Sequence, residues 1–496
     1  MSPIELAARL GRWSAGRGPL YLLLAGRLRA LIDDGELPPG TALPTDRALA
    51  AGLAAGRTTV VAAYDLLRQE GRLVRRQGSG TWVAGAPAGP PSVSTAEPTV
   101  NPVFLNLLDP PDHVAQFACA GPTGAPPAVI AAYRTALGSL GGPDLGYHPA
   151  GHPLLRAALA ARYSALGVPT TASQILVTTG GQQGLALLAR ALIAPGAEVL
   201  VQAPTYPGAL EIFRESAAAL LPIRIGTRAY GDGLARRPAL AYLIALCHNP
   251  TGRTMPPAER QEVVDAALRA EVPLVVDDVL ADLSFPAPAA PAMSAVPAAS
   301  AVPAVPAAVP MAALAPEADE LITVGSLSKL VWGGLRIGWV RAQPALISRL
   351  ARLKAVIDLG SGVLDQLAAV ELIDRLDELI GERSRLLAAR HDHLCAELRE
   401  HLPEWRFERA DGGQTLWVRL PHGDAASYAQ AALRHGVAVL AGGSLDPSGA
   451  SLDHLRIPFV AEPEVLSAVV RSMAGAWHGF AGRATGSLPP LPAIAV

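Results

Sequence analysis

Lysine is almost absent from this chain of 496 residues. Of its 41 lysine and arginine side chains only two are lysines, Lys329 and Lys354. Positive charge is otherwise carried by arginine, so each lysine needs an explanation. For Lys354, which lies in a helical pattern, chance is sufficient. A guanidinium is never deprotonated in a protein, whereas an amine can lose its proton and attack a carbonyl. We therefore interpret Lys329 as a residue that forms a Schiff base.

Cysteine and long apolar runs are also scarce. The three cysteines, Cys119, Cys247 and Cys395, are widely spaced and include no CxxC pair. This pattern fits neither a disulfide framework nor a zinc site, and it favours a reducing compartment. We find no uninterrupted apolar run of about 18 residues that could span a membrane, and no signal-peptide core at the N-terminus. We therefore expect a cytoplasmic protein with no membrane segment and no metal site.

Charge is low and unevenly distributed. Half of the residues are apolar and 17% are charged, which is typical of a globular protein. The net charge is −2, but residues 1–83 contain 11 Arg against 7 Asp and Glu, a balance of +4. The rest of the chain must then sum to −6. A basic head on an acidic body suggests a polyanionic partner for the head.

Two breaks in composition divide the chain. Residues 85–112 begin with a Gly/Pro/Ser-rich stretch and are expected to form a flexible linker between a head, 1–84, and a body, 113–480. Residues 285–310 repeat Ala, Pro and Val without charge, which indicates a flexible insertion because proline breaks helices and sheets. Residues 481–496 are expected to be a loose tail.

The head shows a helical pattern followed by a hairpin. Apolar residues three or four apart predict a first helix, a second from about Thr45 and a third from Arg57. A hairpin is predicted to turn at Gln77–Gly80. The residues that define the three helices are Tyr21, Leu24, Leu28 and Leu31; Leu49 and Leu53; and Val60, Tyr64 and Leu67.

Three segments of the head, PPGTALPTDRALA, GRTTVVAAYDLLRQEG and GSGTWV, resemble the GntR-type winged helix-turn-helix over about residues 18–84. Short polar residues at the start of the third helix suit a DNA major groove. Gly56 stands where such sequences often have a serine cap. The alternative is a winged helix used only for protein contacts. The residues expected to contact double-stranded DNA are Arg47, Arg57, Thr58, Thr59, Arg75, Arg76 and Gly80.

The body alternates short apolar runs with helical patterns. The runs are ILVTT, EVLVQAP, AYLIALC, PLVVDDV and ELITVGS. Near-continuous apolar runs, each followed by a helix, predict strands of a mostly parallel sheet that is buried on both faces. The expected fold is therefore multidomain, with a small α+β head and a large α/β body.

Lys329 has neighbours that suit an aldehyde cofactor with a phosphate group. Ser326 precedes it by three residues and Arg336 follows it by seven, so a hydroxyl and a guanidinium are available for the phosphate. A glycine-rich turn between a strand and a helix offers backbone N–H groups to the same phosphate. That turn contains Thr179, Gly180, Gly181 and Gln182.

Three further residues follow predicted strands. Tyr206 could stack on a pyridine ring, Asn249 could donate to a phenolate oxygen, and Asp277 could hold the pyridine nitrogen protonated. Taken singly, they could equally be a packing tyrosine, a turn asparagine and a helix-capping aspartate. Their common place at the carboxyl ends of strands favours one site.

The motifs GYHPAGHPLLR, TTGGQQ, APTYPG, HNPTG, VVDD, SLSK…GLRIG and LRIPF, in this order, resemble fold-type I aminotransferases of class I over roughly 113–480. The resemblance implies pyridoxal 5'-phosphate bound to Lys329 in a homodimer with a smaller C-terminal subdomain. It also implies that Arg456 binds a substrate or effector carboxylate, while Tyr147 reaches the site of the other subunit. Val279 and Leu280 depart from the family, which commonly has a tyrosine close behind the aspartate.

A GntR-type head joined to an aminotransferase-like body resembles the MocR/PdxR-type transcription regulators. The resemblance implies a pyridoxal-phosphate-dependent DNA-binding regulator whose body senses the cofactor or an amino compound. One alternative is a working aminotransferase with an accessory head, since the whole minimal set for transamination is present. Another is a passive scaffold with an inactive body, which the retention of Lys329 disfavours.

Overall fold

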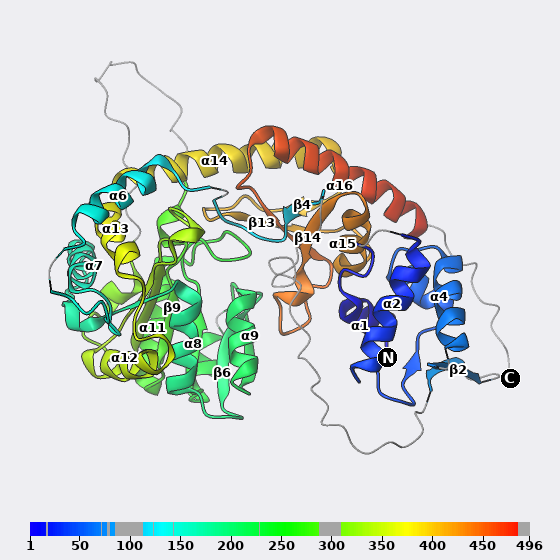
Figure 1. The fold of residues 1–496 in the computed structure, drawn as a ribbon, viewed down its shortest axis with the longest axis horizontal. Coiled ribbons are helices and arrows are strands. Elements are labelled where there is room, and N and C mark those ends of the chain that lie inside the picture. The colour runs from blue at the N-terminus through cyan, green and yellow to red at the C-terminus, as the bar shows by residue number, and fades with distance from the viewer. Residues whose placement is uncertain are drawn as a thin grey trace.

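The computed structural model describes residues 1–15, 18–70, 72–76, 80–84, 113–122, 124–141, 143–227, 229–286 and 309–484 (Figure 1). The predicted linker 85–112, residues 287–308 of the predicted insertion and residues 485–496 of the predicted tail lie outside the described residues. The other four residues of that tail, 481–484, instead complete the last helix.

The head contains the three predicted helices and the two predicted hairpin strands. The third helix begins at Arg57, as predicted, and Thr45 caps the second through its side chain. Of the four residues that indicated the first helix, Tyr21 is 37% exposed, whereas the three leucines are buried. The sequence also missed α1 and β1, which are short. The elements are α1 (Pro3–Leu10), α2 (Leu20–Asp33), β1 (Ala42–Leu43), α3 (Asp46–Gly52), α4 (Arg57–Gln69), β2 (Leu73–Arg76) and β3 (Gly80–Val83).

The body is built on a seven-stranded sheet in the order β5-β11-β10-β9-β8-β6-β7. All five apolar runs form strands of this sheet, as predicted. Among its described strands β11 alone runs against the others. The strands are β5 (Ile175–Thr178), β6 (Glu198–Ala203), β7 (Ala219–Arg224), β8 (Leu240–Leu243), β9 (Leu274–Asp277), β10 (Leu321–Ser326) and β11 (Gly338–Arg341).

Helices cover both faces of this sheet, which explains why its central strands are apolar on both sides. One face packs against α8 (Gly181–Leu192), α9 (Pro207–Glu215) and α12 (Pro344–Asp358). The other packs against α10 (Tyr230–Ala235) and α11 (Pro257–Ala270). Three further helices, α6 (Pro127–Gly138), α7 (Pro153–Ala165) and α13 (Val363–Asp374), pack on one another beside β5.

A second sheet, in the order β12-β13-β15-β14-β4, forms the smaller subdomain. Its strands are β4 (Ala115–Phe117), β12 (Arg406–Phe407), β13 (Thr415–Arg419), β14 (Val437–Ala441) and β15 (His454–Pro458). The helices α14 (Leu376–His401), α15 (Ala425–Arg434) and α16 (Pro463–Ala484) belong to the same part of the chain (Figure 1). No helix within the described residues is long and apolar enough to cross a membrane.

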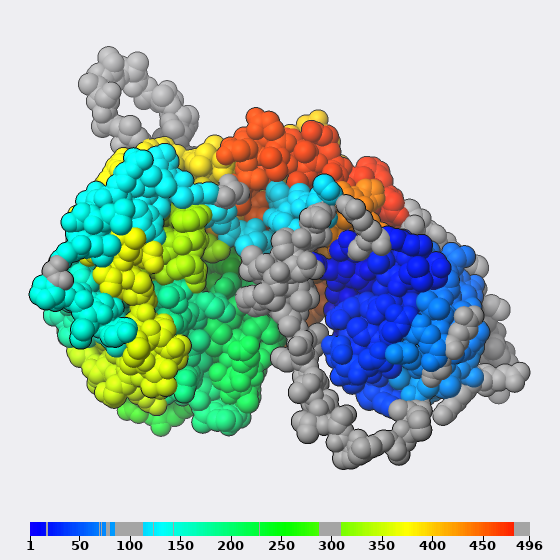
Figure 2. Space-filling model, viewed as in Figure 1, coloured from blue at the N-terminus to red at the C-terminus, as the bar shows by residue number. Residues whose placement is uncertain are grey.

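The head rests on α15 of the smaller subdomain (Figure 2). The last carbonyl groups of a helix have no partner within it, and α15 supplies donors for those of α1 and α3. Gln430 donates to the carbonyl of Gly11, which follows α1. Ser427 donates to the carbonyl of Gly52, the last residue of α3. Arg434 Nη2 lies 2.7 Å from the carbonyl oxygen of Ala54, in the turn before α4.

Candidate functional site

The predicted cofactor residues gather at one edge of the large sheet. Because β5, β6, β8, β9 and β10 are parallel, their carboxyl ends meet at that edge. The glycine-rich turn follows β5, and Asp277 and Ser326 end β9 and β10. The residues that the fold brings to this edge are Thr179, Gly180, Gly181, Gln182, Tyr206, Asn249, Asp277, Ser326, Lys329 and Arg336.

Lys329 lies in the loop after β10. Its Nζ is 2.5 Å from the carbonyl oxygen of Ala120, in the segment that follows β4. Gln414 holds the Lys329 backbone by donating to its carbonyl at 2.8 Å. Burial lowers the pKa of the Lys329 amine, and the positive charge of Arg456 acts in the same direction. A larger share of this amine is therefore neutral, and so nucleophilic, than in water at the same pH.

Asp277 is a buried carboxylate in the same pocket. Tyr242 Oη donates to its Oδ2 at 2.7 Å, and the N–H of Val279 donates to its Oδ1 at 3.0 Å. Burial raises the pKa of Asp277, while these two hydrogen bonds and Lys329 lower it. A carboxylate held in this way can accept a hydrogen bond from a protonated ring nitrogen. Tyr242 reaches Asp277 from β8, because Tyr242 pairs with Val275 and Val275 faces the same side as Asp277.

The glycine-rich turn packs tightly against Arg336. Gly180 caps α8 with φ +87, where a Cβ atom would lie 2.9 Å from Arg336 Nη2. Arg336 Nη2 donates to the carbonyl of Thr179 at 2.5 Å. Ser326 Oγ lies 2.8 Å from the carbonyl of Ile337, on the strand side of the turn. Arg336 therefore lies against the start of α8, whose first N–H groups can donate to a phosphate, whereas the Ser326 hydroxyl contacts Ile337 and Ser328.

Gln182 and Tyr206 form a pair beside this turn. Tyr206 Oη donates to Gln182 Oε1 at 2.9 Å, and Gln182 Nε2 donates to the carbonyl of Gly208 at 3.2 Å. Burial raises the pKa of Tyr206 to about 12, so the phenol stays protonated at neutral pH. Since its side chain already binds Tyr206, Gln182 is better placed to hold that ring than to bind a phosphate.

Arg456 is a buried cation whose hydrogen-bond donors are only partly used. It is 4% exposed, and burial lowers its pKa to about 10. Its Nη2 donates to the carbonyl of Ala118, and its Nη1 lies 3.4 Å from Asn249 Oδ1. Its Nε has no hydrogen-bond partner among the described residues. An orphaned donor on a buried guanidinium fits a carboxylate ligand.

Tyr147 lies outside this pocket. Its side chain is 66% exposed, and the structure does not bring it to the residues around Lys329 of its own chain. An approach to the site of a second subunit therefore stays a prediction.

Sequence reasoning missed three contributors to this site. The sequence marked Tyr242 only as part of a strand. Its contact with Asp277 follows from the pairing of β8 with β9, which puts both side chains on the same face of the sheet. The carbonyls of Ala118 and Ala120 face Arg456 and Lys329 from a segment that is far away in sequence. No motif marked them, because a backbone acceptor has no residue signature.

The interpretation of Lys354 as a chance lysine is corrected by its surroundings. Its side chain is fully buried, and its Nζ lies 2.7 Å from both carboxylate oxygens of Asp358. Gln183 donates to Asp358 Oδ2 at 2.8 Å and accepts the N–H of Thr179 at 2.9 Å. Although burial raises the pKa of Asp358, the bonds from Lys354 and Gln183 hold it below its usual value. Lys354 thus supports the glycine-rich turn from behind.

We expect Lys354→Met to destabilise the body and loosen this turn. Removing one partner of a buried ion pair costs about 3–5 kcal/mol, and the partial exposure of Asp358 places the loss at the low end. Thermal melting should show a lower Tm, and titration with pyridoxal phosphate should show weaker binding. The matched control is Arg349→Met, since Arg349 is an exposed cation on the same helix. Equal melting temperatures for the two variants would contradict this account.

The predicted DNA-contact residues lie on an exposed part of the head. Arg47, Arg57, Thr58 and Arg75 are exposed, and Thr59 is half-buried. Arg57 Nε lies 2.8 Å from Asp46 Oδ2, which orients the guanidinium at the start of α4. Gly80 has φ +97 and nothing near its Cβ position, as suits a wing tip. Arg76 ends β2, but its side chain lies outside the described residues.

Comparison with known proteins divides the chain into the same head and body. Residues 118–471 match the family model of aminotransferase class I and II, and residues 20–83 match that of bacterial regulatory proteins of the gntR family. The uncharacterized HTH-type transcriptional regulator YisV of Bacillus subtilis is 27% identical over 82% of this chain and 86% of its own length. The probable rhizopine catabolism regulatory protein MocR of Rhizobium meliloti is 28% identical over 81% and 82%.

Enzymes are also similar to this chain. The 2-aminoadipate transaminase of Thermus thermophilus is 28% identical over 62% of this chain and 76% of its own length. Among solved structures, the alpha-aminoadipate aminotransferase LysN of Thermus thermophilus, in complex with N-(5'-phosphopyridoxyl)-L-leucine, has a TM-score of 0.66 at 26% identity. It covers 77% of this chain and 95% of its own.

Proposed function

Since this chain belongs to the aminotransferase class I and II family and carries a gntR-family helix-turn-helix domain before it, we propose that it is a DNA-binding transcription regulator that depends on pyridoxal 5'-phosphate. The observation that carries this proposal is the presence, in one chain, of an exposed recognition-helix start and a buried lysine site. A metabolic transaminase needs only the second. A cytoplasmic location, where operator DNA is accessible, is part of the proposal.

The residues gathered at this edge of the large sheet suit both ends of pyridoxal phosphate. That cofactor supplies an electrophilic aldehyde and a ring that withdraws electrons. Lys329 offers a partly neutral amine to the aldehyde, and Asp277 offers a carboxylate to the ring nitrogen. Ser326, Arg336 and the start of α8 would hold the phosphate. The orphaned Nε of Arg456 then remains for a carboxylate on an amino compound.

Sensing requires only a difference in binding between two arrangements of the heads. An amino compound anchored by Arg456 would compete with the Lys329 amine for the aldehyde carbon of the cofactor. A carboxylate that engaged Arg456 Nη2 as well as Nε would compete with the carbonyl of Ala118, and Ala118 follows β4, the edge strand beside β14. Because β14 packs on α15, which bears the head, we infer that effector binding reaches the head along this route.

A working aminotransferase with an accessory DNA-binding head is the second candidate. It is favoured by the assembly of the full set of cofactor residues in one pocket and by the likeness to the 2-aminoadipate transaminase. In either case we propose a homodimer in which Tyr147 reaches the partner's site, because its ring is largely exposed on this chain.

The decisive experiment is selection of DNA by the purified protein. Random duplexes are incubated with the full-length chain, with and without pyridoxal phosphate, and the retained fragments are sequenced. We expect a defined operator whose enrichment changes with the cofactor. Failure of the protein to bind any DNA even at low salt would contradict the regulator assignment and leave the enzyme as the better candidate.

Arg57→Ala should weaken operator binding without changing the lysine site. Loss of a base-reading arginine costs about 1–3 kcal/mol, roughly a five- to 150-fold rise in Kd. Fluorescence anisotropy with the selected operator measures it. Arg68→Ala is the matched control, because it removes the same charge from the last turn of α4. If both variants lose affinity equally, Arg57 acts through charge alone and does not read bases.

A further inference from the structure

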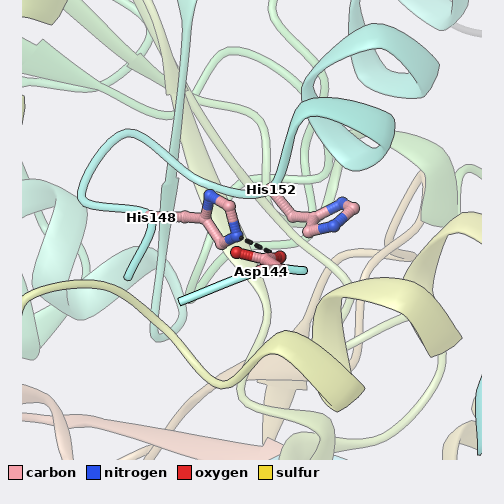
Figure 3. Close-up of side chains that lie close together, drawn as sticks. All are labelled: Asp144, His148 and His152. Carbon is pink, nitrogen blue, oxygen red and sulfur yellow. Dashed lines mark hydrogen bonds and ion pairs between the residues drawn. The ribbon is translucent and has the colours of Figure 1, made fainter. Parts of the chain in front are cut away.

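Three side chains outside the cofactor pocket converge in the loop before α7. They are Asp144, His148 and His152, four residues apart in sequence (Figure 3). Each offers one donor atom, and the three atoms all lie within 4.8 Å of one another. Among the residues that the structure describes, this is the one group of three histidine, cysteine or acidic side chains that comes so close.

The donor atoms of Asp144 and His148 lie close to the separation that two ligands of one metal ion have. Asp144 Oδ2 lies 2.9 Å from His148 Nε2, while Asp144 Oδ1 accepts the N–H of Gly146 at 2.9 Å. Two donor atoms on a tetrahedral ion with bonds of about 2.0–2.1 Å are about 3.3 Å apart, so this pair has to open by only about 0.4 Å. An ion could therefore take the place of the proton shared by this pair after a small movement of the two side chains, and Gly146 would hold the carboxylate in orientation.

His152 completes the set from the start of α7. Its ring centroid is 5.0 Å from that of His148, at 74°. The three donor atoms lie within 4.8 Å of one another, and a rotation of the His152 side chain would bring its ring nitrogen to the separation of about 3.3 Å that a tetrahedral ion requires. That rotation gives up only a long contact, 3.3 Å, from the Leu154 N–H to His152 Nδ1. The backbone stays fixed, because Gln366 accepts the His152 N–H at 2.6 Å.

We propose that Asp144, His148 and His152 bind one divalent first-row transition-metal ion, with Zn²⁺ as the probe. Two imidazoles and one carboxylate suit such ions and leave further positions to water, whereas Ca²⁺ and Mg²⁺ prefer an all-oxygen set. The ion would tie three points of the loop that carries Tyr147 and so fix the position of that exposed ring. No metal site was expected from the sequence, because this spacing within a loop is not a metal-binding motif.

The test is a titration of untagged, full-length, chelator-treated protein with ZnCl₂. Isothermal titration calorimetry, with metal analysis after dialysis, should show one ion per chain bound in the micromolar range or tighter. The ion should also raise the Tm, because a ligand that binds only the folded chain stabilises it. Absence of stoichiometric Zn²⁺ from the wild-type protein would overturn the proposal.

Two variants locate the site. His148→Ala/His152→Ala should lose the ion, and Asp144→Asn, which keeps the shape of the side chain, should bind it at least about tenfold more weakly. The matched control is His393→Ala/His401→Ala, which removes two histidines beside Glu397 on α14. Loss of the ion in the control, with retention in both loop variants, would place the metal elsewhere and refute this site.

Discussion

Lys329→Ala protein should be colourless after incubation with pyridoxal phosphate, whereas the wild type should absorb in the visible. The reason is that the amine of Lys329 lies near Asp277 and Arg336, with its pKa lowered by burial. Borohydride should fix the cofactor covalently to the wild type and not to the variant. We expect a complete loss, the largest effect of any single substitution in the body.

The scarcity of lysine makes this result easy to assign. Only Lys329 and Lys354 can carry a reduced adduct on a side-chain amine. Mass spectrometry of the digested, reduced protein should therefore find the cofactor on the peptide that contains Lys329. Lys354→Met, tested at saturating pyridoxal phosphate because its cofactor binding should be weaker, keeps Lys329 and should keep the adduct. A colourless wild type, or an adduct on Lys354, would refute the assignment.

Arg456→Ala should abolish the response of the loaded protein to amino acids. A buried guanidinium with an unpaired Nε can bind a carboxylate through two N–H groups. Removing one partner of such a buried charge pair costs about 2–5 kcal/mol, so affinity should fall at least about thirtyfold. Titration with the twenty common amino acids, followed by absorbance, should show a shift for at least one with the wild type and none with the variant.

The same titration separates a sensor from an enzyme. A sensor must exchange one amine for another, whereas an enzyme must also move a proton and release a keto acid. With an amino acid and a keto-acid acceptor, we expect turnover far below the median enzyme value of about 10 per second. The matched control for Arg456→Ala is Arg419→Ala. Arg419 is an exposed arginine on the sheet that contains Arg456, and it pairs with Asp453. Rapid repeated turnover by the wild type would establish the enzyme instead.

The strands and the order of the site residues could be predicted because each depends only on a short stretch of sequence. Each apolar run is long enough to specify a buried strand, and a residue that follows such a run lies at the carboxyl edge by geometry alone. Asp277 was predicted on this basis, and Ser326 from its spacing to Lys329; the structure places both at that edge. The helix from Arg57 was predicted for the same reason, since Val60, Tyr64 and Leu67 recur on one face.

What could not be predicted depends on pairing between distant segments. The burial of Lys354 follows from the packing of α12 against α8, and a helical period does not say which helix will be its neighbour. Tyr242 meets Asp277 only through the register of β8 with β9. Tyr21 lies in α2, as its spacing predicted, but the spacing could not show that Tyr21 stands at the exposed edge of the apolar stripe.

The bonds from α15 to the head have a consequence for how such proteins diversify. Their acceptors are main-chain carbonyls at the ends of α1 and α3, and every amino-acid sequence supplies these. These three bonds therefore depend on the main chain at the helix ends, while Ser14 adds one side-chain bond to Gln430 at 3.3 Å. We expect substitutions at the exposed start of α4 to leave these bonds intact. The proposed DNA-reading residues can then vary without loss of the contact between head and body.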